Sequence, residues 1–157
     1  MRGNGDEVSK ALGKAFSLLA VRSCSEAEMR SRLLRAGYSE GVVADALVRL
    51  KDYGYVDDAR FSREKACALR DRGFGKSRIA HELKVRGVEP GLIGEAIGDA
   101  FGETGEEEIA YRLVVRRLPG YQRLPDPVKK RRLYGLLIRR GFSGGLASRM
   151  IKKILGD

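Results

Sequence analysis

Two adjacent acids, Asp57 and Asp58, are unexpected in a chain this basic. They lie in the stretch YGYVDDARF at 53–61. Paired carboxylates can hold a metal ion or take part in phosphoryl transfer. Such a site needs further carboxylates or histidines, and no other part of the sequence points to residues that would supply them. A helix start also explains the pair, with Asp57 as N-cap and Asp58 in the first turn. Val56 would then pack on Phe61 as a hydrophobic staple. We favour the helix start.

Other residue types capable of catalysis are scarce. Cys24 and Cys67 are the only cysteines and His81 is the only histidine. These three residues form no Cys/His pattern with zinc-binding spacing, and neither cysteine has an evident base beside it. Isolated cysteines in a cytosolic chain are more often buried small hydrophobic residues than nucleophiles. We therefore expect no enzymatic activity, no cofactor and no metal.

The stretch GFGKS at 73–77 resembles the end of a phosphate-binding P-loop. The full motif needs another glycine five residues before Gly75, where Arg70 stands, and a preceding strand where the pattern indicates a helix. We reject a nucleotide site. The alternative is a junction between two helices, with Gly73 ending the first and Gly75 opening the second.

Basic residues are concentrated in the last third of the chain. The 157 residues carry 31 Lys and Arg against 21 Asp and Glu, a net charge of +10, and residues 102–157 contribute +7 of it. Such an excess favours a polyanionic partner. The run KKRR at 129–132 falls in the first two turns of a predicted helix, where positive charge opposes the helix dipole. This locally unfavourable placement favours a binding role over a merely solvated face.

Two groups of basic residues are candidate binding sites. The first forms a predicted basic surface of Arg116, Arg117, Arg123, Lys129, Lys130, Arg131, Arg132, Arg139, Arg140, Lys152 and Lys153. The secondary group consists of Arg70, Arg72, Lys76, Arg78, Lys84 and Arg86. Acids are interspersed in the secondary group, so solubility and binding remain alternatives for it.

Three glycines reveal that the helices carrying these basic residues belong to a unit repeated along the chain. Strand signals are almost absent, and apolar residues recur at helical spacing. Gly37, Gly87 and Gly141 each follow a helical run and precede a hydrophobic residue, as left-handed helix C-caps do. Apolar residues stand at matching offsets before and after each glycine: Met29, Ile79 and Leu133; Leu33, Leu83 and Leu137; Tyr38, Val88 and Phe142; Leu47, Ile97 and Ile151. The chain therefore contains three copies of one unit.

The predicted fold is all-α, with three tandem three-helix repeats forming an elongated, curved molecule. We place a flexible tail at 1–8 and repeats at 9–55, 56–102 and 103–157, the last with a Pro-rich insertion at 118–127. In the third repeat, Thr104 and Glu107 are predicted to form a capping box. Asp126 is predicted to cap the following helix, with Pro127 in its first position.

The chain has no apolar run near the ~20 residues of a membrane span, and its N-terminus lacks the apolar region of a secretory signal. A cytoplasmic protein without a membrane partner is expected.

Residues 54–88, GYVDDARFSREKACALRDRGFGKSRIAHELKVRGV, resemble the central signature of the RecX family of recombination regulators. The most specific parts are G-Y-V-D-D-x-x-F at 54–61 and the pattern of Arg70, Gly73, Ile79, Glu82, Leu83 and Gly87. The resemblance extends over about residues 9–155. It implies a non-enzymatic protein that binds the RecA recombinase, lodges in the groove of the RecA–DNA filament and limits strand exchange and ATP hydrolysis. It also implies weaker, salt-sensitive contact with single- or double-stranded DNA.

Other functions remain open on the residues alone. A general nucleic-acid-binding helical repeat protein would use the basic third repeat without any need for RecA. A small scaffold for an acidic protein would use the same charge. For each of these functions an elongated monomer is the expected state.

Overall fold

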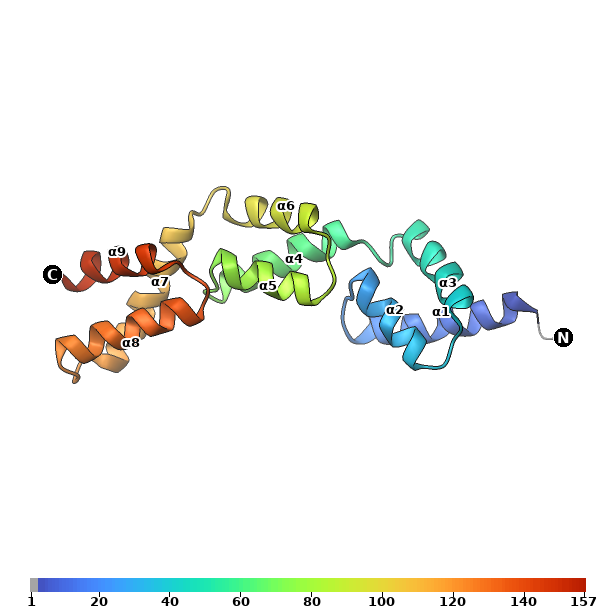
Figure 1. Cartoon of the computed structure of the whole chain (residues 1–157), viewed down its shortest axis with the longest axis horizontal. Coiled ribbons are helices and arrows are strands. Elements are labelled where there is room, and N and C mark those ends of the chain that lie inside the picture. The colour runs from blue at the N-terminus through green and yellow to red at the C-terminus, as the bar shows by residue number, and fades with distance from the viewer. Residues whose placement is uncertain (1–2) are drawn as a thin grey trace.

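The structure, a computed structural model, describes residues 3–157, which form nine α-helices and one 3-10 helix without a strand. These are α1 (Asn4–Val21), α2 (Glu26–Arg35), α3 (Glu40–Asp52), α4 (Asp58–Asp71), α5 (Lys76–Val85), α6 (Pro90–Phe101), α7 (Glu106–Arg117), η1 (Leu118–Tyr121), α8 (Asp126–Arg139) and α9 (Gly144–Leu155). They form three successive groups of three α-helices along one long axis, with the two ends of the chain at opposite ends (Figure 1). The predicted all-α, three-repeat, elongated fold is confirmed.

Glycines end the second helix of each unit, as predicted. Gly37, Gly87 and Gly141 have φ angles of 97°, 76° and 90°, a conformation that side chains with a Cβ rarely adopt. The residue after each glycine donates its N–H to the carbonyl of the leucine four positions before the glycine. Those leucines, Leu33, Leu83 and Leu137, are fully buried in all three units. The three glycines therefore set one register for the whole repeat.

Asp57 starts a helix, which answers the question raised by the acid pair. Its side chain accepts a hydrogen bond from the Arg60 N–H at 3.1 Å, and α4 begins at Asp58. The predicted staple is wrong, because Val56 belongs to the buried cluster of the first unit and Phe61 to that of the second. The Val56 N–H bonds back to the Leu50 carbonyl at 3.3 Å, which turns Val56 towards the first unit.

Three other predictions about helix starts need correction. The N-cap of α7 is Gly105 and no side chain caps it, so the Thr104–Glu107 capping box does not form. The N-cap of α8 is Pro125, and Asp126 is the first helical residue, not the cap. A flexible tail was expected at 1–8. Residues 1–2 of it lie outside the described residues, whereas α1 begins at Asn4 and its Val8 is buried. The apolar contact of Val8 with the first unit explains the longer helix.

The GFGKS stretch is a junction between helices, as predicted. Gly73, with φ of 84°, follows the end of α4, and Gly75 is the N-cap of α5. A Cβ on Gly75 would lie 2.6 Å from the carbonyl oxygen of Gly141, so only glycine allows the second and third units to approach this closely.

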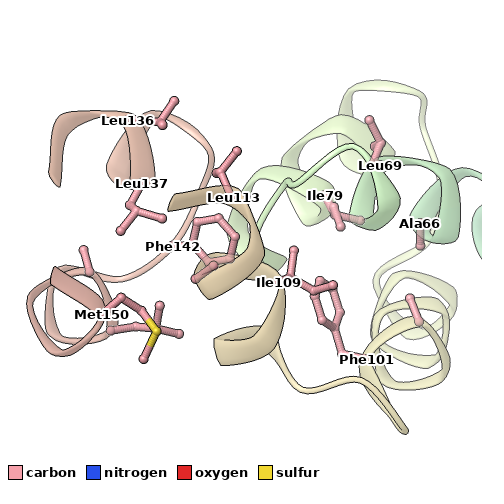
Figure 2. Packing of buried hydrophobic residues seen from close by; sticks show 14 of the residues in the cluster. Ala66, Leu69, Ile79, Phe101, Ile109, Leu113, Leu136, Leu137, Phe142 and Met150 are labelled. Carbon is pink, nitrogen blue, oxygen red and sulfur yellow. The ribbon is translucent and has the colours of Figure 1, made fainter. Parts of the chain in front are cut away.

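The buried apolar residues form two separate clusters. One lies entirely in the first unit, from Val8 to Val56. The other runs through the second and third units without a break. Leu113 of α7 and Phe142 lie where those two units meet, and Leu113 also lies against Gly73 (Figure 2). The second and third units are therefore joined by a shared core, which the first unit does not share.

Polar contacts join the first unit to the second. The Ser25 hydroxyl donates to the Arg86 carbonyl at 2.5 Å, and the Glu26 N–H donates to Asp58 Oδ1 at 2.8 Å. Arg86 Nη1 pairs with Glu28 Oε1 at 2.7 Å. Burial acts to raise the pKa of Glu28, but the hydrogen bonds from Arg86 and from the Ser25 N–H outweigh it and hold that pKa below its ordinary value.

The same arrangement recurs between the second and third units. The Gly75 N–H donates to the Arg140 carbonyl at 2.6 Å, and the Lys76 N–H donates to Glu106 Oε1 at 3.0 Å. At both junctions the N-terminus of one second helix meets the C-terminus of the next, so α2, α5 and α8 follow one another in a row (Figure 1). Opposite ends of the helix dipoles meet at each junction, which stabilises the stacking.

Candidate functional site

An aromatic ring surrounded by arginines lies at the junction of the second and third units. Phe74 lies in the short turn between α4 and α5. The guanidinium carbons of Arg72, Arg78 and Arg140 lie 5.5, 6.0 and 4.6 Å from the centre of its ring. Cation–π attraction to the ring offsets part of the repulsion between these like charges.

Arg140 is the centre of this group. Its Nη1 donates a hydrogen bond to the Arg72 carbonyl at 2.8 Å, which ties α8 to the end of α4. Partial burial lowers the pKa of Arg140, and the positive charges of Arg117, Arg72 and Arg116 lower it further. Arg116 and Arg117 therefore lie close enough to act on Arg140 from the end of α7. We call Phe74 with Arg72, Arg78, Arg116, Arg117 and Arg140 the Phe74 cluster.

The Phe74 cluster has few negative charges of its own. Among residues 3–157, Glu82 is the only acid within 4 Å of a cluster arginine, pairing with Arg78 at 3.3 Å. Arginines that converge with so few counter-ions raise the local positive potential, and their planar guanidinium groups match the geometry of phosphate and carboxylate oxygens. The cluster is therefore suited to bind an anionic partner.

The cluster contains members of both basic groups predicted from the sequence. Arg116, Arg117 and Arg140 come from the predicted basic surface, whereas Arg72 and Arg78 come from the secondary group. The close approach of Gly75 to Gly141 brings the two groups together.

The other members of the predicted basic surface are more dispersed. Lys129 is largely buried and pairs with Asp126 at 3.0 Å, which also holds the pKa of Asp126 below its ordinary value. Lys152 pairs with Asp157 at 2.7 Å, and Lys153 lies over the Tyr111 ring at 5.4 Å. Lys130 is half-buried. Exposed positions are held by Arg123, Arg131, Arg132 and Arg139.

Two members of the secondary group hold the fold together. Arg86 is engaged by Glu28 at the first junction, and Arg70 donates to the Ala100 carbonyl and pairs with Asp71. Lys84 is exposed on α5, and Lys76 lies 5.6 Å from the centre of the Phe101 ring. A role in binding for any residue of either group stays a prediction.

Sequence reasoning missed Phe74 as part of a site, because GFGKS was considered as a phosphate loop or as a helix junction, and only its glycines were given a role in that junction. A signal for it was present. Arg140 precedes Gly141 at the position that Arg86 holds before Gly87, and aligning the repeats would have placed both arginines at junctions between units.

The remaining residues with possible metal-binding or thiol chemistry lie apart from the Phe74 cluster. Residues 3–157 contain no group of three or more His, Cys, Asp or Glu side chains placed to hold a metal. Cys24 and Cys67 are both free thiols. Among the helices of the described residues, none is long and apolar enough to cross a membrane.

Comparison with known proteins identifies the family. The models of the first, second and third three-helix domains of RecX match residues 11–50, 57–97 and 105–151 in turn. Regulatory protein RecX of Amycolatopsis mediterranei is 32% identical over 153 residues, which is 97% of this chain and 87% of that protein. The chain belongs to the RecX family. Regulatory protein RecX of Thermobifida fusca is 33% identical over 151 residues, covering 96% of this chain and 81% of the relative.

A solved RecX structure shares the fold. The crystal structure of RecX from Lactobacillus salivarius matches with a TM-score of 0.80, covering 96% of this chain and 97% of that one, at 16% sequence identity. Identity this low shows the fold alone. Membership of the RecX family confirms the resemblance read from residues 54–88, and the names of the relatives support a regulatory role.

Proposed function

We propose that this protein regulates the RecA recombinase by binding in the groove of the RecA–DNA filament, where it limits strand exchange and the coupled ATP hydrolysis. Family membership supports RecA as the partner, because the relatives are named as RecX regulatory proteins. The single observation that supports the binding mode is the Phe74 cluster, a poorly neutralised group of arginines at the junction of the second and third units.

The shape and charge suit a helical groove that contains nucleic acid. An elongated repeat protein can follow a groove over several protein subunits. The cluster arginines would contact phosphates or acidic side chains lining it. The chain would act by occupying the groove, without catalysis, as a cytoplasmic monomer.

The decisive experiment measures DNA-stimulated ATP hydrolysis by the RecA of the same organism, titrated with this protein. Its own DNA binding is measured in parallel at two salt concentrations. Inhibition well below the concentration at which the protein covers DNA supports a target on the filament. If inhibition is absent, or requires saturated DNA, the RecA proposal is wrong.

A matched pair of variants tests the Phe74 cluster within that assay. Arg117→Glu should weaken inhibition about tenfold or more, since the charge of a cluster arginine changes sign. Arg112→Glu is the control, because Arg112 lies on the same helix but is exposed and already paired with Glu108 at 2.7 Å. Equal effects of the two changes would show that only net charge matters.

A general nucleic-acid-binding protein is the second candidate, and the charge distribution favours it. Residues 102–157 carry +7 of the net +10. This function predicts that the logarithm of DNA affinity falls steeply with the logarithm of salt concentration, and that RecA is not needed.

A further inference from the structure

A cavity lined by arginines lies at the junction of the first and second units and shares no residue with the Phe74 cluster. Its volume is about 320 Å³, and its walls come from α2, from the residue after α1 and from the end of α5. Four arginines line it: Arg22, Arg32, Arg35 and Arg86. Among the described residues in its walls, Glu28 is the only acid. Four positive charges against one negative charge make this cavity suited to an anion.

Glu28 leaves part of this positive charge without a counter-ion. Its Oε1 lies 2.7 Å from Arg86 Nη1 and 3.5 Å from Arg22 Nη2, so one carboxylate serves both arginines. Within residues 3–157, no carboxylate lies within 4 Å of the guanidinium groups of Arg32 and Arg35. Arg32 is half-buried, so its charge is partly removed from water without a compensating partner. These two guanidinium groups are therefore available to an anion from solution.

The unpaired charge follows from an exchange of residue types between the units. In the second unit, Arg78 and Glu82 pair with each other along α5 at 3.3 Å. The equivalent positions of the first unit, 50 residues earlier, have the acid first and the arginine second, as Glu28 and Arg32. Glu28 pairs instead with Arg86, outside its own helix. Arg32 is therefore left without a carboxylate, a feature that the second unit does not share.

The end of α5 also lines the cavity, and carbonyl groups at a helix C-terminus carry partial negative charge. Hydrogen bonds compensate part of this charge. The Arg86 carbonyl accepts from the Ser25 hydroxyl at 2.5 Å, and the Lys84 carbonyl accepts from the Gly87 N–H at 2.9 Å. The full charges of the guanidinium groups therefore dominate the potential inside the cavity.

We propose that this cavity binds two neighbouring phosphate groups, such as those of pyrophosphate, of a nucleoside diphosphate or of consecutive nucleotides in a nucleic-acid strand. Two adjacent phosphates carry about two to three negative charges near neutral pH, which complements the excess of three positive charges in the cavity walls. The planar guanidinium groups of Arg32 and Arg35 can each donate two parallel N–H bonds to phosphate oxygens. The Ser31 hydroxyl also lines the cavity and can donate a further hydrogen bond.

Sodium pyrophosphate is the probe, titrated into the ¹⁵N-labelled full chain at constant ionic strength so that screening does not change. We expect amide shift changes centred on residues 31–35 and 86–87, together with changes in the guanidinium N–H signals of Arg32 and Arg35. Arg32→Gln should weaken pyrophosphate binding about tenfold or more, because it removes charge-assisted hydrogen bonds to the ligand.

Arg30→Gln is the matched control. Arg30 lies on the same helix, is exposed and does not line the cavity, so this change removes the same charge two residues away. It should leave pyrophosphate affinity nearly unchanged. Absence of shift changes at residues 31–35 and 86–87 would overturn the proposal. Equal weakening by Arg32→Gln and Arg30→Gln would also overturn it, because net charge alone would then explain the binding.

Competition identifies the source of the phosphates. A short oligothymidylate without terminal phosphates is added to the pyrophosphate complex, and the ³¹P signal of pyrophosphate is followed. Return of that signal to its free position would identify consecutive phosphates of a strand as ligands of the cavity, whereas an unchanged signal would identify a small phosphate compound. The measurement contains no RecA, so failure of pyrophosphate to bind would overturn the phosphate site and leave the proposed inhibition of RecA untouched.

Discussion

The ion pair between Arg86 and Glu28 should control how firmly the first unit is held to the second. The two side chains are 23% and 16% exposed, and their closest atoms are 2.7 Å apart. Exposed pairs contribute about 0–1 kcal/mol, whereas breaking a buried pair costs about 3–5 kcal/mol. The intermediate burial places the cost of Arg86→Ala at about 2 kcal/mol of unfolding free energy. The Arg86 carbonyl remains, so the hydrogen bond from Ser25 is kept.

Urea unfolding monitored by circular dichroism measures this change in unfolding free energy. A double-mutant cycle isolates the interaction energy between Arg86 and Glu28. Glu28→Gln keeps a side-chain oxygen for the Ser25 N–H but removes the charge. We expect a coupling energy of about 1–2 kcal/mol between the two positions. Additive effects of the two substitutions would refute the reasoning.

The pH dependence provides a separate check with a definite sign. The pKa of Glu28 lies below its ordinary value of 4.5 in the folded protein. The unfolded chain therefore binds this proton first as pH falls. The contribution of the pair is complete above the ordinary pKa and is lost as pH falls through the folded pKa. The difference between Arg86→Ala and the parent should accordingly shrink between pH 7 and pH 3, and an unchanged difference would contradict the assignment.

Two further substitutions test the junctions. Gly75→Ala should lower the free energy of unfolding in urea by about 2–3 kcal/mol, because its Cβ would meet the backbone of Gly141 at 2.6 Å. Gly94→Ala, on an open helical surface, should be neutral or stabilising. Equal effects of the two substitutions would contradict the close approach of Gly75 to Gly141. Burial raises the pKa of Asp58 in the folded protein, so its charge lowers stability as pH rises through that pKa. Asp58→Asn keeps an acceptor for the Glu26 N–H, so this variant should melt within a few degrees of the parent at pH 7. Asp58→Ala removes the acceptor and should lower the free energy of unfolding by about 1 kcal/mol. Identical losses of stability in the two variants would show that the hydrogen bond is unimportant.

The sequence predicted those features that depend on a few neighbouring residues. Gly37, Gly87 and Gly141 showed the repeat because a left-handed cap needs glycine and a nearby apolar contact. Asp57 was recognised as a cap because an N-cap and its first turn are local. At the start of α7 the same reasoning failed by one position, because Gly105 adopts the extended N-cap conformation that Thr104 was expected to adopt.

Contacts between units could not be predicted in the same way. The apolar stripes of the three units look alike, and nothing local shows that the second and third share a core while the first does not. The Phe74 cluster needs α7, α8 and the α4–α5 turn to meet, which depends on the orientation between units. Net charge therefore indicated an excess of basic residues in the third unit, and gave no indication of how Arg116, Arg117 and Arg140 are arranged around Phe74.

The separate core of the first unit has a mechanical consequence. A load applied along the molecule would stretch every unit in series, and the joint that yields first is the one held by fewest apolar contacts. That joint is the polar one between the first and second units, since the other is reinforced by a core that continues through it. Directional hydrogen bonds and ion pairs break over short displacements, whereas a shared core resists bending over its whole width. We therefore expect bending of the molecule to be concentrated between the first and second units, while the second and third units move together as one body.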